Sequence, residues 1–411
     1  MRGEIICVGD ELTSGRVGDV NARFAAARLW PLGLAPTAIT TVGDDPDEIV
    51  ATLKRALGRC DWLIVSGGLG TTEDDLTAAA AARALDLPLI EDPGKLAELE
   101  ALVGARGRSL TPEIRRMALM PAGAASLDPR SAGFGLNTPA GQPLFFLPGV
   151  PEEFQRIIER RVAPELAARF GAGSLVTRTL RLYGLPESEV GRRLAGLTNG
   201  QEGVGLGYYP VFPEVLVVLS ARAADAGAAS ARLEPLAAEA GARLAGFVIV
   251  DGAARLEERV GELLKAGDLT LALAESCTGG LIGHRITAVA GSSAYFERGY
   301  VVYSNRAKQE MLSVEAETIA RFGAVSEECA REMALGARLG AGVDLGLAVT
   351  GIAGPEGGSA EKPVGTVWFG LSHQRATTAE VRHFFGDRQM VKLQAAETAL
   401  DLLRRHLEAA G

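Results

Sequence analysis

The stretch LTLALAESCTGG, residues 269–280, decides the fold of the last part of the chain. Its mostly apolar first six residues predict a buried strand over Leu269–Ala274. A polar turn with two glycines follows, and a helix is expected over Gly279–Val289. In open α/β sheets, ligands bind at the carboxyl ends of strands, and helix N-termini suit a phosphate or an oxyanion. The stretch therefore predicts an α/β domain with Ser276 and Thr278 at the mouth of a site.

A Ser-x-Thr-Gly turn on its own also has a purely structural explanation, because Thr278 is an ordinary helix N-cap. Two more polar strand ends favour a site. A strand expected at Leu345–Val349 runs into TGIAGP at 350–355, and a strand expected at Gly299–Tyr303 runs into the start of a helix. Further strands are expected at Val364–Leu371 and Ala379–Phe385, with a closing helix at Arg388–Leu407.

The hydroxyl groups of this region have a candidate activating group nearby. A cation beside a hydroxyl favours its deprotonated form, which activates Ser or Tyr without histidine. Tyr303 and Lys308 are therefore candidates to act with Ser276, although Lys308 on its own could equally be a solvated surface residue. Cys277 competes as nucleophile, but no histidine is near it in sequence, and we expect it to be a packed residue. Arg388 is placed to hold a phosphate or to pair with an acid.

Four ordered motifs resemble the CinA C-terminal domain, the nicotinamide-nucleotide amidase family: ESCTGG at 275–280, YSNRAK at 303–308, TGIAGP at 350–355 and PVGTV at 363–367. The resemblance implies hydrolysis of the carboxamide of nicotinamide mononucleotide to nicotinic acid mononucleotide and ammonia, without a metal or other cofactor. It implies Ser276 as the nucleophile, with Tyr303 and Lys308 as the activating pair. We expect the substrate to be bound by Thr278, Gly279, Gly280, Asn305, Thr350, Gly351, Gly354, Thr366 and Arg388.

The first part of the chain alternates strands and helices, which predicts a three-layer α/β domain with a mostly parallel sheet. Strands are expected at Glu4–Val8, Ala38–Val42, Asp61–Val65 and Pro143–Leu147, and helices at Val20–Leu32, Asp47–Leu57, Leu76–Leu85 and Glu152–Phe170. GDELTSG at 9–15 and SGGLGTTEDDLT at 66–77 each follow a strand. A glycine-rich loop can hold phosphates, and carboxylates can hold a divalent cation. Asp74 and Asp75 also begin a helix, where acids are stabilised in any case.

These N-terminal loops, with LPGVP at 147–151, resemble the molybdopterin-binding domain of the MoaB and MogA type, in the variant found in CinA proteins. Thr71 departs from the family, which usually has proline there. In this variant the resemblance implies metal-dependent hydrolysis of ADP-ribose at its diphosphate, whereas cofactor-synthesis relatives bind molybdopterin. The implied site residues are Asp10, Glu11, Gly67, Gly68, Gly70, Asp74 and Asp75. The implied ligands of the divalent cation are Asp10, Glu11, Asp74 and Asp75.

The middle of the chain has its own pattern after a linker expected at 171–174. Strands are expected at Thr177–Tyr183, Val204–Tyr209, Val215–Ala221 and Phe247–Val250, with helices at Glu187–Leu197 and Ala226–Leu244. This predicts a small α+β domain, which resembles the KH-type domain of the same family. It lacks a Gly-x-x-Gly loop with flanking basic residues, so we expect no direct nucleic-acid binding. The predicted domains are 1–170, 175–251 and 255–411, in the order of a full-length CinA chain.

Composition limits the other classes of function. The 411 residues carry a net charge of −9 without a basic stripe, which argues against nucleic-acid binding. No apolar run is long enough to span a membrane, and four scattered cysteines predict reduced thiols and a cytoplasmic location. The resemblance implies a homodimer and a role in pyridine nucleotide salvage. The alternative is a regulatory or adaptor protein of competence and DNA damage, with the recombinase RecA as a partner, which only the family name supports.

Overall fold

A computed structural model describes residues 1–72, 74–105, 107, 109–171, 173–252 and 254–410. The chain forms two compact units: Met1–Thr177 with Ser220–Leu233, and Arg178–Leu219 with Glu234–Gly411. This division does not follow the predicted domain boundaries, so the three predicted domains stay a prediction. Ala172 of the expected linker and Glu73 of the expected phosphate loop lie outside the described residues.

The first unit has a six-stranded sheet in which four neighbouring strands run parallel. In spatial order its strands are β2 (Pro36–Val42), β1 (Gly3–Val8), β3 (Trp62–Ser66), β8 (Pro143–Leu147), β7 (Phe134–Asn137) and β6 (Ala125–Ser126). β7 and β6 pair antiparallel, while β2, β1, β3 and β8 pair parallel. The mostly parallel α/β sheet predicted from the strand–helix alternation is confirmed.

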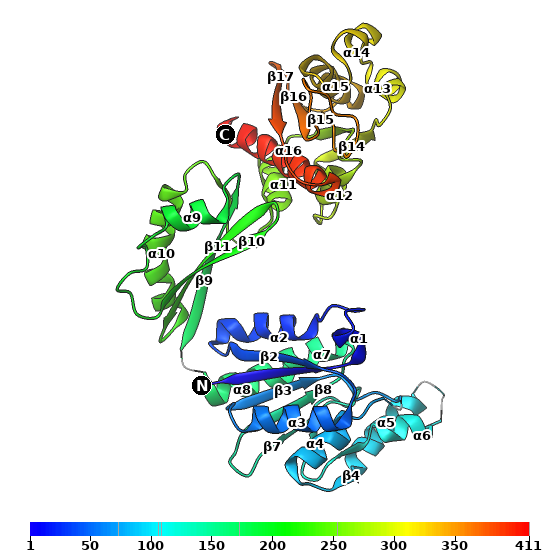
Figure 1. Cartoon of the computed structure of the whole chain (residues 1–411), viewed down its shortest axis with the longest axis vertical. Helices are drawn as coiled ribbons and strands as arrows, with labels where there is room; N and C mark the ends of the chain where they lie inside the picture. The colour runs from blue at the N-terminus through cyan, green and yellow to red at the C-terminus, as the bar shows by residue number, and fades with distance from the viewer. Residues whose placement is uncertain (73, 106, 108, 172, 253, 411) are drawn as a thin grey trace. The chain divides into compact units, whose positions relative to one another are not determined.

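Side chains of β1 alternate between two cores, one on each face of this sheet. Ile6 and Val8 pack in the core under α3 (Pro46–Leu57) and α4 (Thr77–Leu85). Ile5 and Cys7 pack in the other core, under helices α2, α7 and α8 (Figure 1). The remaining α-helices and strands of this part are α1 (Asp10–Thr13), α2 (Asn21–Leu29), β4 (Leu89–Glu91), α5 (Pro93–Gly104), α6 (Pro112–Arg116), β5 (Leu119–Pro121), α7 (Pro151–Ile157) and α8 (Ala163–Phe170). Two short helical segments, η1 (Trp30–Leu32) and η2 (Ile158–Val162), follow α2 and α7 directly.

The predicted middle part forms a four-stranded sheet in the order β10, β11, β9, β12. Its strands are β9 (Ser174–Tyr183), β10 (Val204–Val211), β11 (Glu214–Ala223) and β12 (Val248–Asp251). Its helices are α9 (Glu187–Arg193) and α10 (Ala226–Arg243). This is the small α+β arrangement that the sequence predicts, except that α9 ends at Arg193 rather than Leu197.

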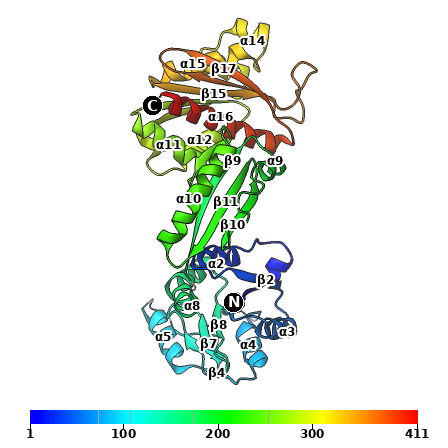
Figure 2. The same ribbon diagram turned by 90° about the vertical axis from the view of Figure 1, so that its left-hand side faces the viewer.

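The second unit also has a five-stranded mixed sheet in the order β14, β13, β15, β16, β17. β13 runs parallel to β14 and β15, and the last two strands pair antiparallel. Figure 2 shows α15 on one face and α11, α12 and α16 on the other. The strands are β13 (Leu271–Glu275), β14 (Phe296–Val301), β15 (Leu345–Gly351), β16 (Thr366–Ser372) and β17 (Thr377–His383). The helices are α11 (Leu256–Ala266), α12 (Leu281–Thr287), α13 (Asn305–Leu312), α14 (Ala316–Phe322), α15 (Glu327–Ala341) and α16 (Arg388–Ala410).

Two boundaries in this sheet differ from the prediction and affect the site. β14 ends at Val301, so Tyr303 lies in the connection to α13 and not at a strand tip. α12 begins at Leu281, because Gly279 and Gly280 adopt left-handed φ values of 62° and 93°. The N–H of buried Val302 donates to the Glu275 carbonyl at 2.8 Å, so the chain stays tied to the end of β13 just after β14.

The four cysteines are free and buried. Among the described residues, no helix combines enough length with enough apolar character to cross a membrane.

A buried ion cluster joins α11, α12 and α16. Arg285 donates to a carboxylate oxygen of Glu257 and to one of Glu397, both at 2.7 Å. Burial raises the pKa of Glu397 to about 7, because the loss of water outweighs the attraction of Arg285. Glu397 therefore titrates near neutral pH at the joint between three helices.

Glu397→Gln is expected to change how stability depends on pH. A carboxyl group whose pKa is raised by folding stabilises the folded state while it is protonated, and this contribution is lost as the pH rises toward 7. Glutamine cannot titrate, so from pH 5 to pH 8 the free energy of unfolding of the variant should rise by on the order of 1–3 kcal/mol relative to that of the unmodified protein. Urea unfolding of both proteins at these two pH values measures the gain. A stability difference that is the same at both would contradict the prediction.

Candidate active sites

A cavity of about 220 Å³ opens where β13 and β15 end and α13 begins. It brings together the three polar strand ends that the sequence singles out. The lining residues are Ser276, Cys277, Tyr303, Asn305, Lys308, Ala324, Val325, Thr350, Gly351, Ala353 and Arg388.

Ser276 and Lys308 form a buried pair in this cavity. The Lys308 Nζ atom lies 3.0 Å from Ser276 Oγ and donates to the Val302 carbonyl at 2.9 Å. Lys308 is only 1% exposed and Ser276 7%, so Lys308 is not a solvated surface residue. Burial lowers the pKa of the Lys308 ammonium below its usual value. A lysine amine held in this way can become neutral and accept a hydroxyl proton.

Local structure fixes both members of the pair. The N–H of Ser276 donates to the Val349 carbonyl at 2.9 Å, which ties the turn after β13 to β15. Ser304 caps α13 by accepting the N–H of Ala307, so the helix begins at Asn305 and Lys308 lies in its first turn.

The N-terminus of α12 is already occupied by a carboxylate that sequence reasoning missed. Glu275 is 2% exposed and accepts the N–H groups of Gly280, Ile282 and Gly283. The amide of Gly280 is therefore not free to bind a phosphate in this structure, contrary to the expectation for this helix start. The available signal was an acid six residues before Leu281, the first residue of α12, because acids are stabilised at helix N-termini.

Tyr303 lines the cavity but contacts Arg388 rather than the Ser276–Lys308 pair. Its side chain is 61% exposed, and its hydroxyl oxygen accepts a hydrogen bond of 2.6 Å from Arg388. Arg388 also donates to the Gly354 carbonyl at 2.7 Å. The structure thus places Arg388 against neutral oxygens, and not against an acid.

The other predicted substrate-binding residues divide into two groups. Asn305, Thr350 and Gly351 line the cavity, although the Thr350 hydroxyl donates to the Ala324 carbonyl at 2.7 Å. The hydroxyl of fully buried Thr278 has no hydrogen-bond partner among the described residues, and Thr366 bonds to the Pro363 carbonyl. Neither lines the cavity, and neither do the predicted Gly279, Gly280 and Gly354.

Cys277 behaves as the packed residue that the sequence predicts. It is 4% exposed and belongs to the apolar core beneath α16. Burial raises the pKa of its thiol to about 12. A thiol with so high a pKa is a poor nucleophile at neutral pH, because the thiolate is the reactive form.

The first unit has a second cavity, of about 520 Å³, between the loops that follow β1, β3 and β8. Of the predicted residues, Asp10 does not line it, whereas Glu11, Gly67, Gly68, Gly70, Asp74 and Asp75 do. Sequence reasoning missed three acids that line it: Asp19, Asp44 and Glu153. Its lining contains six carboxyl side chains and, among the described residues, no Lys, Arg or His.

The acids of this second cavity have different local roles. Asp75 accepts the N–H and the hydroxyl of Thr72, so it holds the glycine-rich loop. Asp10 and Asp44 exchange backbone-to-carboxylate hydrogen bonds of 2.9 and 3.1 Å. Burial, together with the charges of Asp10, Glu11 and Asp74, raises the pKa of Asp44. The signal for Asp44 was the sequence Gly43-Asp44-Asp45 directly after a strand.

The four carboxylates predicted as metal ligands do not form a ready-made centre. In the parts of the chain that the structure describes, no three Asp, Glu, Cys or His side chains gather so that they could hold a metal ion. The metal site therefore stays a prediction, and its donors would have to include oxygens from another source.

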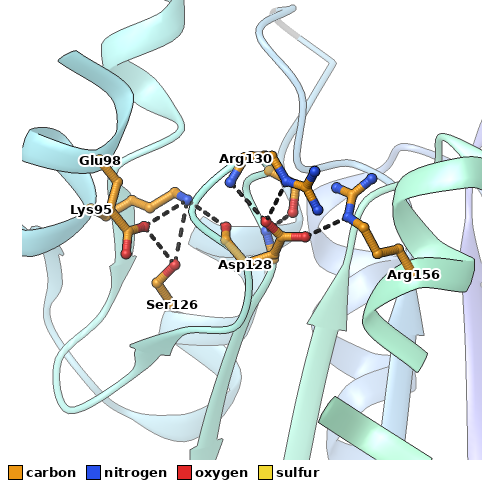
Figure 3. Close-up of polar contacts among 8 residues, drawn as sticks. Lys95, Glu98, Ser126, Asp128, Arg130 and Arg156 are labelled. Carbon is orange, nitrogen blue, oxygen red and sulfur yellow. Dashed lines mark hydrogen bonds and ion pairs between the residues drawn. The ribbon is translucent and has the colours of Figure 1, made fainter. Parts of the chain in front are cut away.

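A buried polar network supports the wall of the second cavity (Figure 3). The amine of Lys95, 1% exposed, donates to Glu98 at 3.1 Å and to the Asp128 carbonyl at 2.9 Å. The carboxylate of Asp128 accepts from Arg156 at 2.6 Å. Arg156 belongs to α7, which also carries Glu153, so the network fixes the helix that presents this acid to the cavity.

Comparison with known proteins matches three family models along the chain. The description "Probable molybdopterin binding domain" matches residues 4–168, "Damage-inducible protein CinA KH domain" matches 177–249, and "CinA C-terminal domain" matches 253–407. A CinA-like protein of Citrifermentans bemidjiense is 46% identical over 409 residues, covering 99% of this chain and 98% of the relative. One of Geobacter sulfurreducens is 46% identical over 415 residues, covering 99% of both.

Two solved structures resemble single parts of the chain. The competence damage-inducible protein A of Klebsiella pneumoniae is 40% identical, with a TM-score of 0.37, over 37% of this chain and 95% of that one. The molybdopterin biosynthesis enzyme MoaB of Thermus thermophilus is 28% identical, with a TM-score of 0.29, over 40% of this chain and 91% of that one.

Proposed function

The chain belongs to the CinA family, and from that premise we propose that its C-terminal part is an amidohydrolase that converts nicotinamide mononucleotide and water to nicotinic acid mononucleotide and ammonia. The single observation that carries the proposal is the 3.0 Å contact between Lys308 Nζ and Ser276 Oγ inside a cavity. A buried hydroxyl beside a buried amine is an activated nucleophile with its own base.

The first half of the reaction forms an ester. Ser276 Oγ attacks the carboxamide carbon while its proton moves to neutral Lys308, and the carbonyl oxygen becomes an oxyanion. The oxyanion then collapses, the C–N bond breaks, and the leaving nitrogen departs as ammonia with the proton held by Lys308. The second half repeats these steps with water: Lys308 takes a proton from water, the hydroxide attacks the ester, and the proton returns to Ser276.

The oxyanion needs hydrogen-bond donors that are already in place. The backbone N–H groups of Cys277 and Thr278 follow the nucleophile directly, and within the described part of the chain neither donates to a backbone carbonyl. They are the candidates for this role. The full burial of Thr278 would hold its amide in a fixed position.

The proposal is tested by incubating the purified full-length protein with nicotinamide mononucleotide, with EDTA present, and measuring ammonia and nicotinic acid mononucleotide. Equal amounts of both products are expected. The absence of ammonia release would refute the amidase proposal and leave the regulatory role as the better explanation.

For the N-terminal part we propose hydrolysis of the diphosphate of ADP-ribose with a divalent cation. The observation that favours this is the 520 Å³ cavity, which has carboxylates and glycine-rich loop backbone but no basic side chain in its described lining. A diphosphate cannot approach so many carboxylates without a counter-cation. Mg²⁺ is commonly bound by one or two carboxylates together with substrate phosphates, so one or two of the lining acids, with Glu11 and Asp74 as the candidates, would hold it together with the substrate. The ion would neutralise charge on the diphosphate and its leaving phosphate.

Asp74→Ala is expected to lower release of AMP from ADP-ribose by about 100-fold or more, because it removes a carboxylate from the cation's surroundings. The assay compares the variant with the unmodified protein in Mg²⁺ and in EDTA. Asp47→Asn, which changes an exposed acid that pairs with Arg83 outside the cavity, is the matched control. Full activity of Asp74→Ala would mean that Asp74 is only a structural residue.

A further inference from the structure

Helix α16 carries a second cation close to the Ser276 site. Arg388 and Lys392 are four residues apart and therefore lie on one face of the helix. Arg388 lines the cavity. A Cβ atom placed on Gly279 would have the Lys392 amine as its nearest neighbour, at 3.8 Å. The amine thus lies over the turn that carries the nucleophile, where α16 packs against α12 (Figure 1).

Among the described residues, no carboxylate forms an ion pair with either cation. Lys392 is half-buried, and its amine makes no hydrogen bond or ion pair with any described residue. Within the described part of the chain, Arg388 bonds to the Gly354 carbonyl and the Tyr303 hydroxyl alone, which leaves further N–H donors on its guanidinium. The neighbouring acid, Asp387, accepts the N–H of Met390 and caps the helix.

The cavity itself also has no acid in its described lining, because none of those residues is Asp or Glu. In a chain with a net charge of −9, a cavity with Lys308, Arg388 and nearby Lys392 but no lining acid is suited to an anionic ligand. Lys308 is committed to Ser276, so the other two cations are available to the part of the ligand that does not react.

We propose that Lys392, together with Arg388, binds the phosphate of the substrate and makes the site select a phosphorylated nicotinamide compound over its unphosphorylated riboside. The inference rests on the proposed amidase function and adds its substrate specificity. A charged hydrogen bond from each side chain would hold the phosphate while the carboxamide meets Ser276. Lys392 is a binding residue in this scheme and takes no part in proton transfer.

The kinetic test compares Lys392→Ala with the unmodified protein on two substrates. For nicotinamide mononucleotide, we expect KM to rise by about 10- to 100-fold with kcat nearly unchanged. For nicotinamide riboside, kcat/KM should not change, because that substrate has no phosphate. Lys392→Arg should restore most of the affinity. Lys265→Ala removes a cation that lies over the Tyr295 ring, away from the cavity, and should affect neither substrate. Equal losses on both substrates would overturn the proposal.

A binding test separates this inference from the proposed reaction. Calorimetry with nicotinic acid mononucleotide and with its riboside requires no turnover. If the mononucleotide binds more strongly than the riboside and Lys392→Ala loses this difference, the phosphate site is supported. This holds even if the protein releases no ammonia, because the absence of ammonia would refute only the amidase function. Equal binding of both compounds, or undiminished binding by Lys392→Ala, refutes the phosphate site.

Discussion

Ser276→Ala is expected to lower kcat for ammonia release from nicotinamide mononucleotide by roughly 10⁴-fold or more, the size of effect known for loss of a serine nucleophile. The alanine variant cannot form the ester, and among the described residues no other hydroxyl is hydrogen-bonded to Lys308. Because Ser276 is 7% exposed and small, the substitution should leave the fold unchanged.

The control for this variant is its neighbour in sequence. Cys277 follows Ser276 directly and also lines the cavity, so Cys277→Ala removes the competing thiol. Since burial raises the pKa of Cys277 to about 12, its loss should cost stability rather than catalysis, and kcat should stay within a few-fold. Ammonia and the mononucleotide product are measured for both variants. An active Ser276→Ala variant combined with an inactive Cys277→Ala variant would transfer the nucleophile to the thiol.

Lys308→Met is expected to lower kcat by about 10²- to 10⁴-fold, the usual contribution of a general acid–base group. Methionine keeps the length and apolar character of the buried stem but cannot exchange a proton. Lys308→Arg should not restore activity, because a guanidinium stays protonated at working pH. These variants distinguish a catalytic amine from one that only fills space.

The pH dependence of the unmodified enzyme gives a second readout for Lys308. The amine must be neutral to accept the Ser276 proton, so activity should rise with pH through the pKa of Lys308. Burial lowers that pKa, which moves the rise below the range of an ordinary lysine. The residual activity of Lys308→Met should lack this rise. A rise that persists unchanged in the variant would show that another group titrates.

Much of the site was predictable because it lies at strand ends. Apolar runs followed by polar, glycine-containing turns indicated the regions of Ser276, Lys308 and Thr350, and parallel strands bring such ends to one edge of a sheet. The contact partner of Tyr303 was not predictable in the same way. Its hydroxyl meets Arg388, the first residue of α16, which is 85 residues away in sequence, and no local pattern encodes a pairing between a loop and a helix start so far apart.

Acidic residues were harder to interpret from sequence than hydroxyls. Asp75 was predicted as a metal ligand and Glu275 was not singled out, yet each accepts hydrogen bonds from backbone N–H groups of its own turn. Asp44 was not singled out, although it lies in the acidic cavity. A carboxylate can cap a helix, bind a cation or pair with an arginine, and only its neighbours in space decide among these roles.

The sequence alone determined the order of strands and helices, the α/β class of both large sheets and the turns that carry the reactive side chains. These features follow from hydrophobic periodicity, glycine positions and polar residues after strands, which are all local properties of the sequence. Only the tertiary structure decided which groups meet. It buried Lys308 beside Ser276, turned Tyr303 toward Arg388 and left Lys392 without an acidic partner among the described residues. The physical reason is that burial and the distance between charges depend on how separate segments pack, and these two quantities set the state of an ionisable group.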